Sequence, residues 1–140
     1  MNWQPSPPYT TPKFSDFSIA NLETCDERLR QIFHEVIKHV DCRVLEGHRD
    51  KERQNFMVAQ RKSGLPWPKS KHNSVPSRAV DVVPYPIDWN NLQRFAMFAG
   101  FVKGIATEQG IPLRCGIDWN GNFDPTDNWI DAPHFEIIGD

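Results

Sequence analysis

The chain has 140 residues, 39% of them hydrophobic and 24% charged, which is typical of one globular domain and too short for two. A net charge of −2 excludes the strongly basic balance of nucleic-acid-binding domains. No apolar run approaches the roughly 18 residues needed to cross a bilayer. We therefore expect a monomer that neither binds nucleic acid nor inserts into membranes.

The N-terminal segment is predicted to be an extended, proline-rich arm over residues 1–14, followed by a single domain over residues 15–140. The arm has neither a basic start nor an apolar stretch, so no signal peptide is predicted. The three cysteines, Cys25, Cys42 and Cys115, form no C-x-x-C pair. We expect them to be reduced residues of the core.

The first half of the domain carries two helix signals and one strand signal. The first helix is predicted to begin at a capping box formed by Thr24 and Glu27. Behind it, apolar residues recur at helical spacing: Leu29, Ile32, Phe33, Val36, Ile37 and Val40. A short strand is predicted over residues 43–45. Asp50 is predicted to cap a second helix that runs to about Ser63.

The second half begins with a long loop and a β-rich run over residues 79–83. A third helix is predicted over residues 90–109, and its buried face is predicted to hold Leu92, Phe95, Ala96, Ala99, Val102 and Ala106. A loop rich in Asp, Asn and Gly leads to a last strand over residues 134–138. Because helices and strands do not alternate regularly, we predict an α+β fold with a mixed or antiparallel sheet and flanking helices.

Three polar residues indicate a metal site. Asp81 interrupts an apolar strand, where an ionised carboxylate needs a compensating partner. His134 begins the last strand, and His72 lies in the loop before Asp81. Two imidazoles and a carboxylate suit Zn²⁺ and leave a fourth position for water. From residue types alone, three unconnected structural residues are an equal alternative.

Four separated blocks of the sequence resemble one enzyme family. Ser70-Lys71-His72 followed by Ala79-Val80-Asp81 is similar to the S-x-H…G-x-A-x-D signature of the zinc D-alanyl-D-alanine carboxypeptidase family, which includes the phage L-alanyl-D-glutamate peptidases. The segments 46–54, 114–119 and 131–136 resemble further blocks of that family, in the same order. The resemblance covers nearly the whole chain after the arm, and it implies the family's fold, which is also that of hedgehog-type domains.

The resemblance also implies roles for individual residues. His72, Asp81 and His134 would bind one Zn²⁺, and Asp131 would be the general base that activates water. Arg49 would stabilise the oxyanion, and Ser70 and Gln54 would contact the substrate. Glu136 would support a metal-binding residue rather than bind the metal itself.

The resemblance favours a phage endolysin that cleaves the L-alanyl–D-glutamate bond of peptidoglycan and waits in the host cytoplasm until it is released to the cell wall. One alternative is a D-alanyl-D-alanine carboxypeptidase, in which Arg78 or Arg114 would bind the terminal carboxylate. Another is a non-catalytic zinc-binding domain of a virion. The presence of both Asp131 and Arg49 favours an enzyme.

Two patterns depart from known zinc motifs. The family usually has six residues between its first His and the Asp, whereas eight residues lie between His72 and Asp81. A longer loop is inexpensive to accommodate. The sequence around His34 and His39 looks like the protease motif H-E-x-x-H, but its histidines are five positions apart and lie on different faces of a helix. We expect both on the surface.

The oxygen-rich loop near the C-terminus is a candidate calcium site. It contains Asp118, Asn120, Asn122 and Asp127, but it does not match the pattern of an EF-hand. An ordinary solvated turn is the alternative interpretation.

Overall fold

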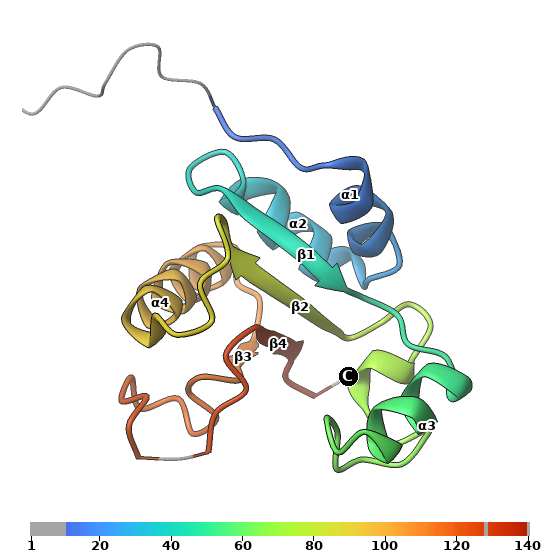
Figure 1. Ribbon diagram of the computed structural model, residues 1–140. Helices are drawn as coiled ribbons and strands as arrows, with labels where there is room; N and C mark the ends of the chain where they lie inside the picture. Colours follow the sequence, from blue (N-terminus) through green and yellow to red (C-terminus); the bar gives the residue numbers. More distant parts are fainter. Residues whose placement is uncertain (1–10, 128, 140) are drawn as a thin grey trace, which may run out of the picture.

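A four-stranded antiparallel sheet forms the centre of the computed structural model, which describes residues 11–127 and 129–139. The strand order is β1-β2-β4-β3, and the strands are β1 (Cys42–Glu46), β2 (Ala79–Pro84), β3 (Leu113–Cys115) and β4 (His134–Ile137). The helices are α1 (Asp16–Glu23), α2 (Glu27–Val36), α3 (Lys51–Ala59) and α4 (Leu92–Glu108), with a 3-10 turn η1 (Lys71–Asn73) (Figure 1). The predicted α+β class is confirmed.

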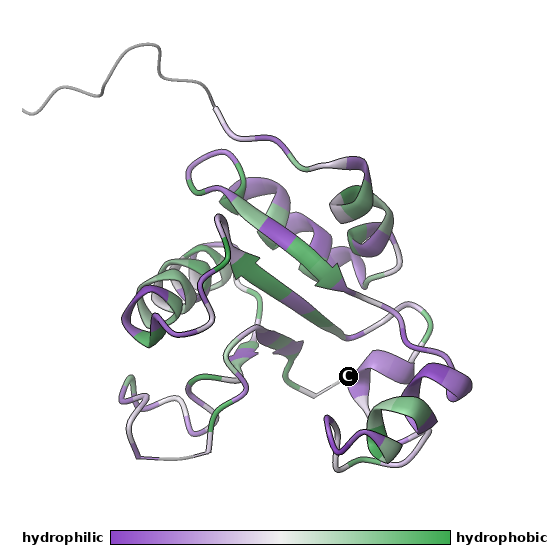
Figure 2. Cartoon of the chain, in the orientation of Figure 1, coloured by the Kyte–Doolittle hydropathy of each residue, from purple (hydrophilic) through white to green (hydrophobic). Residues whose placement is uncertain are grey.

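One face of the sheet is buried against helices α1, α2 and α4. Side chains alternate along a strand, so Val80 and Val82 of β2 point into this core together with Phe135 and Ile137 of β4. The ring of Phe135 lies between α2 and α4, with ring centroids 5.3 Å from Phe33 and 6.1 Å from Phe98. Strand β2 is hydrophobic for most of its length (Figure 2). The alternate residues of β2 and β4 are left for the opposite face.

The start of the domain differs from the prediction. Helix α1 was not predicted, because only Ser18 and Leu22 of it are buried and it has almost no apolar stripe. The predicted capping box is wrong: Thr24 is the C-cap of α1, and the N-cap of α2 is Asp26, whose carboxylate accepts from the backbone N–H of Arg28. The hydroxyl of Thr24 instead donates to the carbonyl of Asn21 and accepts from the N–H of His48.

Further along the chain, the predicted elements exist with shifted boundaries. Asp50 caps α3 as predicted, but the helix ends at Ala59 rather than near Ser63. Leu92 is 51% exposed at the first turn of α4, and Phe98 is buried in its place. Strand β3 was not predicted, because three residues are too few to show an alternating pattern.

The three cysteines are free and buried in the core, as predicted. Burial raises the pKa of each thiol to about 12. Most of the predicted arm lies outside the described residues; at its end, the Phe14 ring packs on the core, 6.1 Å from the ring of His34. Within the described residues, no helix has the length and apolar character of a membrane span.

Candidate metal centre and surrounding cleft

Two of the predicted metal ligands face each other across neighbouring strands. Asp81 of β2 pairs with His134 of β4 in the antiparallel register, so their side chains leave the same face of the sheet. Asp81 Oδ1 lies 3.4 Å from His134 Nδ1. This is the face opposite the apolar core, which is why a carboxylate occurs within a strand of valines.

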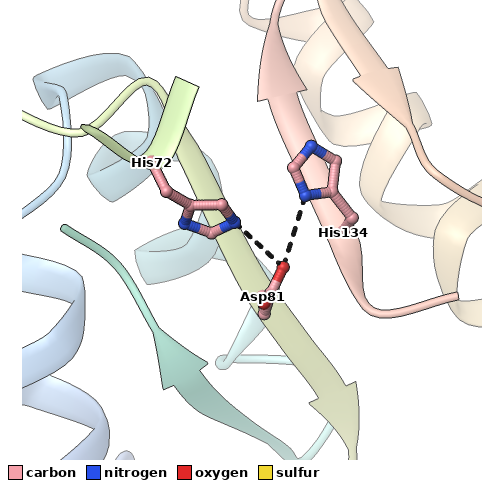
Figure 3. A group of neighbouring side chains, drawn as sticks. All are labelled: His72, Asp81 and His134. Atoms are coloured by element: carbon pink, nitrogen blue, oxygen red, sulfur yellow. Dashed lines mark ion pairs between the residues drawn. The ribbon is translucent and has the colours of Figure 1, made fainter. Parts of the chain in front are cut away.

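The third residue, His72, reaches Asp81 from the turn η1. Ser70 caps this turn, and its hydroxyl accepts from the N–H of His72. The His72 ring is 2% exposed, and its Nε2 lies 3.3 Å from Asp81 Oδ1 (Figure 3). The long spacing between the two residues does not separate them, because the N–H of Arg78 returns to the carbonyl of Lys71 and closes the extra loop.

Gly47 orients the His72 ring. The Gly47 carbonyl oxygen lies 2.8 Å from His72 Nδ1, on the side of the ring opposite Asp81. A Cβ atom at this position would lie 2.3 Å from Thr24 Oγ1 and 2.4 Å from the carbonyl oxygen of Asn21. Only glycine allows the chain just after β1 to approach the end of α1 this closely, so the position of the Gly47 carbonyl depends on the absence of a side chain.

Glu136 orients the His134 ring. Its Oε1 lies 2.8 Å from His134 Nε2, and its Oε2 lies 3.3 Å from Lys71 Nζ and 3.7 Å from Arg114 Nη1. Lys71 also donates to the carbonyl of Ile137. Burial acts to raise the pKa of Glu136, but the hydrogen bond and charge of His134 outweigh burial and lower it. Glu136 is therefore an ionised acceptor for His134.

The electrostatics of the three residues are those of a desolvated ionic cluster. Burial disfavours an ionised Asp81, but the two imidazoles hold the pKa of its carboxyl well below the usual range. Burial also acts to lower the pKa of His134, yet Asp81 and Glu136 raise it to about 9. One ligand atom from each of His72, Asp81 and His134 can be chosen so that all three lie within 4.8 Å of one another.

Arg49 lies beside this cluster in a network that holds its guanidinium. Nε and Nη2 donate to the two carboxylate oxygens of Glu46, and Nη1 donates to Gln54 Oε1. Nη2 also lies 3.8 Å from Asp81 Oδ2, and the residue is only 5% exposed. The cation next to Asp81 is thus fixed in place before any substrate enters.

The structure corrects the role expected for Gln54. Its side chain is fully buried, with the amide oxygen accepting from Arg49 and Asn73 and the amide nitrogen donating to Ser63 Oγ and the carbonyl of Leu65. No hydrogen-bonding group of the amide is left for a substrate. Gln54 therefore positions Arg49 and the turn after α3 instead of contacting substrate.

Asp131 lies at the edge of the cluster, with Oδ2 3.9 Å from His134 Nδ1 and a side chain 41% exposed. Burial raises the pKa of Asp131, and repulsion by Asp81 raises it further. Gly116 allows this arrangement, because a Cβ there would lie 2.2 Å from the carbonyl oxygen of Asp131. A carboxylate with a raised pKa, open to solvent beside the cluster, is suited to accept and return a proton.

These residues line one cleft of about 1140 Å³, whose walls include residues of α3 and of the loop that precedes β4. Arg49, Ser70, the three candidate ligands, Asp131 and Glu136 all contribute to its surface. Ser70 is 8% exposed and already caps η1, so its contact with substrate stays a prediction. Trp119 and Trp129 form part of the opposite side, stacked with ring centroids 6.1 Å apart.

The oxygen-rich loop lies outside this cluster. The amide groups of Asn120 and Asn122 donate to Asp127 Oδ2, and Asp118 Oδ2 accepts from the N–H of Phe123. These contacts form a network within the loop. Calcium binding there stays a prediction.

Sequence reasoning missed two groups that shape the site. Gly47 and Gly116 make close approaches that are visible only in three dimensions, and Lys71 and Arg114 meet at Glu136 from separate elements. All four residues lie inside segments already noted for their family resemblance, and that was the available signal. The histidines set aside as surface residues, His34 and His39, are both exposed on or just after α2.

Comparisons with known proteins agree on one group of relatives. Residues 10–138 match the family described as phage L-alanyl-D-glutamate peptidase. The L-alanyl-D-glutamate peptidase of Escherichia phage T5 is 30% identical over 136 residues, which cover 90% of this chain and 98% of that protein. The crystal structure of the Serratia marcescens L-Ala D-Glu endopeptidase ChiX superposes with a TM-score of 0.70 at 28% identity, covering 87% of this chain and 86% of the other.

Proposed function

The chain belongs to the family of phage L-alanyl-D-glutamate peptidases, and from that premise we propose that it hydrolyses the L-alanyl–D-glutamate bond of peptidoglycan with one Zn²⁺ bound by His72, Asp81 and His134. Family membership supports the reaction and the substrate. The observation that carries the metal assignment is the convergence of three ligand atoms within 4.8 Å in the cleft.

The protonation pattern of the three residues fits a zinc site. A backbone carbonyl can only accept, so His72 Nδ1 carries a proton toward Gly47 and its Nε2 keeps a lone pair toward Asp81. Likewise, Glu136 accepts from His134 Nε2, which leaves Nδ1 toward the centre. His72 Nε2 and Asp81 Oδ1 are buried atoms without a hydrogen-bond partner. A metal cation would satisfy both atoms.

The proposed chemistry divides between the metal and the protein. Zn²⁺ bound there would polarise the scissile carbonyl and make a water molecule more acidic. Asp131 would take a proton from the attacking water and return it to the departing amine of D-glutamate, a role supported by its raised pKa. Arg49 uses three of its five N–H groups within the protein, and the other two are available to the oxyanion.

The alternative functions receive less support. The matched family and both named relatives are L-alanyl-D-glutamate peptidases rather than carboxypeptidases, and neither Arg78 nor Arg114, the cations considered for a terminal carboxylate, lines the cleft. A non-catalytic zinc domain has no need of a general base, yet Asp131 lies beside the candidate ligands with a raised pKa. The monomeric state and the storage of the enzyme in the host cytoplasm stay predictions.

The proposal is tested by separating metal binding from proton transfer. Wild-type protein should contain about one zinc per chain and release fragments of purified peptidoglycan with a new N-terminal D-glutamate. Asp131→Asn should keep its zinc and its fold but turn over roughly 10²–10⁴ times more slowly, the usual contribution of a positioned general base. Loss of zinc in this variant would make Asp131 a ligand, and near wild-type turnover would assign the base elsewhere.

A further inference from the structure

The cleft has a strongly asymmetric distribution of charge. Its α3 side, which includes the turn after the helix and the segment leading to η1, presents Arg53, Arg61, Lys62 and Lys69. The lining residues from position 89 onward include Trp119, Trp129 and Pro133 but no lysine or arginine. α3 lies on one side of the sheet end and the loop before β4 on the other (Figure 1). A substrate that crosses the cleft therefore meets cations at one end and aromatic rings at the other.

Three of these cations are not neutralised by the protein. Arg53 Nε lies 3.1 Å from Glu46 Oε1 and is therefore already paired. In contrast, Arg61, Lys62 and Lys69 are exposed and have no acidic partner within the part of the chain that the structure describes. Unpaired cations along one wall of a cleft attract an anionic ligand.

The backbone at Arg61 is a second, independent sign of function. Arg61 has a φ of 57°, in the left-handed region that glycine normally occupies after a helix. Its N–H bonds to the carbonyl of Val58, and the next N–H bonds to that of Met57, which is the hydrogen-bonding pattern of a helix C-terminus that favours glycine. An arginine kept in a strained position within a cleft indicates that its side chain is used.

The lining residues continue outward from the catalytic residues along α3 and into the turn that follows it. Arg53 and Met57 lie four positions apart on one face of α3, and Arg61 follows in the turn after the helix ends at Ala59, so that these three residues form a row along the cleft. The row begins beside Glu46, which holds Arg49 next to Asp81. From Arg53 to the end of α3 at Ala59 the helix rises about 9 Å, the length of about three extended residues, and Arg61 lies beyond that end. The row can therefore follow several residues of a bound peptide.

The proposed substrate carries anions on one side of its scissile bond. A glutamyl residue has two carboxyl groups, and because the chain continues through only one of them, the other stays ionised near neutral pH. This carboxylate belongs to the amine-bearing fragment that leaves when the L-alanyl–D-glutamate bond is cut. The L-alanyl side contributes no such charge.

We propose, on the basis of the proposed function, that the α3 wall binds the carboxylates on the D-glutamate side of the scissile bond, with Arg61 as a specificity-determining residue. The L-alanyl side then extends toward Trp119 and Trp129. This assignment sets the direction of the stem peptide across the cleft and makes the enzyme selective for stem peptides whose carboxylates are free.

The test uses two synthetic stem peptides that differ only in charge. In one, every carboxyl group after the L-alanyl carbonyl is free; in the other, each is a carboxamide. Wild-type enzyme should cut the free acid with a kcat/KM about 10- to 100-fold higher, the range expected for charge-assisted hydrogen bonds. Arg61→Gly should reduce this preference roughly 3- to 10-fold, mainly through KM, because the contact is remote from the reacting bond.

The same variant separates function from folding. Arg61→Gly relieves the backbone strain, so its stability in urea should be equal to or higher than that of wild type while its activity on the free acid falls. The control is Lys51→Gln, a cation of α3 that lies over the Trp67 ring and does not line the cleft. Lys51→Gln should leave the preference unchanged.

Three results would count against the inference. Equal kcat/KM for the two peptides in wild type would overturn it, while cleavage of both would leave the proposed function standing. A preference that survives Arg61→Gly unchanged would remove Arg61 from the assignment. Cleavage of neither peptide would overturn the proposed function itself, and the inference with it.

Discussion

His72 and His134 present a ring nitrogen to the same oxygen of Asp81 from two differently built regions of the molecule. His72 lies in a three-residue 3-10 turn at the end of a long loop, and its ring is held by the backbone carbonyl of Gly47. His134 lies in a strand paired on both sides, and its ring is held by the carboxylate of Glu136. A neutral acceptor thus orients one imidazole and a charged acceptor the other.

This difference predicts which kind of substitution will disturb the orientation of each imidazole. A side-chain acceptor such as Glu136 can be replaced directly, and its replacement changes the charge around His134. A backbone acceptor can be disturbed only by moving the backbone, and Gly47 is packed so that any side chain would move it. Metal binding should therefore respond to packing on the His72 side and to charge on the His134 side.

The largest effect is expected from removing either imidazole. His72→Ala and His134→Ala should each lose zinc and activity, because each removes one of the three proposed ligands. The metal-free proteins should differ. His134→Ala leaves two carboxylates, Asp81 and Glu136, without the cation between them, whereas His72→Ala leaves the Gly47 carbonyl unpaired and removes an imidazole from Asp81 alone, so His134→Ala should cost more. Its melting temperature in chelator should be the lower of the two.

Elemental analysis and thermal melting measure both outcomes. If His72→Ala retains a full complement of zinc, the turn η1 does not supply a ligand and the comparison fails. Equal melting temperatures for the two metal-free variants would show that burying Asp81 and Glu136 without the charge of His134 does not lower the stability of the fold.

The next effect is expected at Gly47. Gly47→Ala places a Cβ within 2.4 Å of two oxygen atoms, so the backbone must shift. We expect a loss of about 1–3 kcal/mol in the free energy of unfolding, as for other overpacked sites. Zinc affinity should fall as well, because the shift displaces the carbonyl that orients His72.

Gly104→Ala is the matched control for Gly47→Ala. Gly104 lies inside α4, and a Cβ there has no neighbour within 4 Å. The change should raise stability by about 0.5–1 kcal/mol, because alanine is the better helix former. Unfolding in urea and competition with a zinc chelator give both quantities. An unchanged zinc affinity in Gly47→Ala would contradict the role given to its carbonyl.

A smaller effect is expected on the charged side. Glu136→Gln keeps an oxygen that can accept from His134 Nε2 but removes the negative charge, so zinc affinity should fall by roughly 10- to 100-fold with little change in fold. Glu35→Gln is the control, since Glu35 makes the same kind of contact to His39 at 3.2 Å on the surface. If both variants bind zinc like wild type, the charge of Glu136 does not matter to the metal.

The smallest effect is a pH dependence of the metal-free protein. The folded-state pKa of His134, about 9, lies above its ordinary value of 6.5. Protonation of His134 therefore stabilises the fold, fully below pH 6.5 and progressively less as the pH rises to about 9. The melting temperature in chelator should fall by several degrees across that window, and by less in Glu136→Gln. A flat profile would show that the Asp81–His134–Glu136 contacts do not depend on charge.

Most of the fold, and the residue types of the candidate metal ligands, could be predicted from the sequence, because both follow from patterns of neighbouring residues. Strand β2, helix α4 and the Asp50 cap of α3 follow from periodicity and capping. Asp81 was noticed because a carboxylate in a run of valines is anomalous on physical grounds. The family blocks then indicated His72 and His134 as its partners.

Other features depend on neighbours that are distant in the sequence. Helix α1 and strand β3 have weak sequence patterns of their own. They are stabilised by packing and strand pairing with the rest of the domain. Gln54 was predicted to contact substrate, but the turn after α3 accepts both hydrogen bonds of its amide nitrogen, and Arg49 and Asn73 donate to its amide oxygen. No local pattern could reveal that burial.

The sequence by itself determined which residues are chemically able to bind a metal, move a proton and stabilise an anion. Only the tertiary structure decided how they are oriented: Gly47 contacts His72 across 25 positions, and the strained Arg61 lines the same cleft as the three candidate ligands. The physical reason is that ligand types follow from side-chain chemistry, whereas ring orientation, burial and charge neutralisation arise from contacts between segments that only folding brings together.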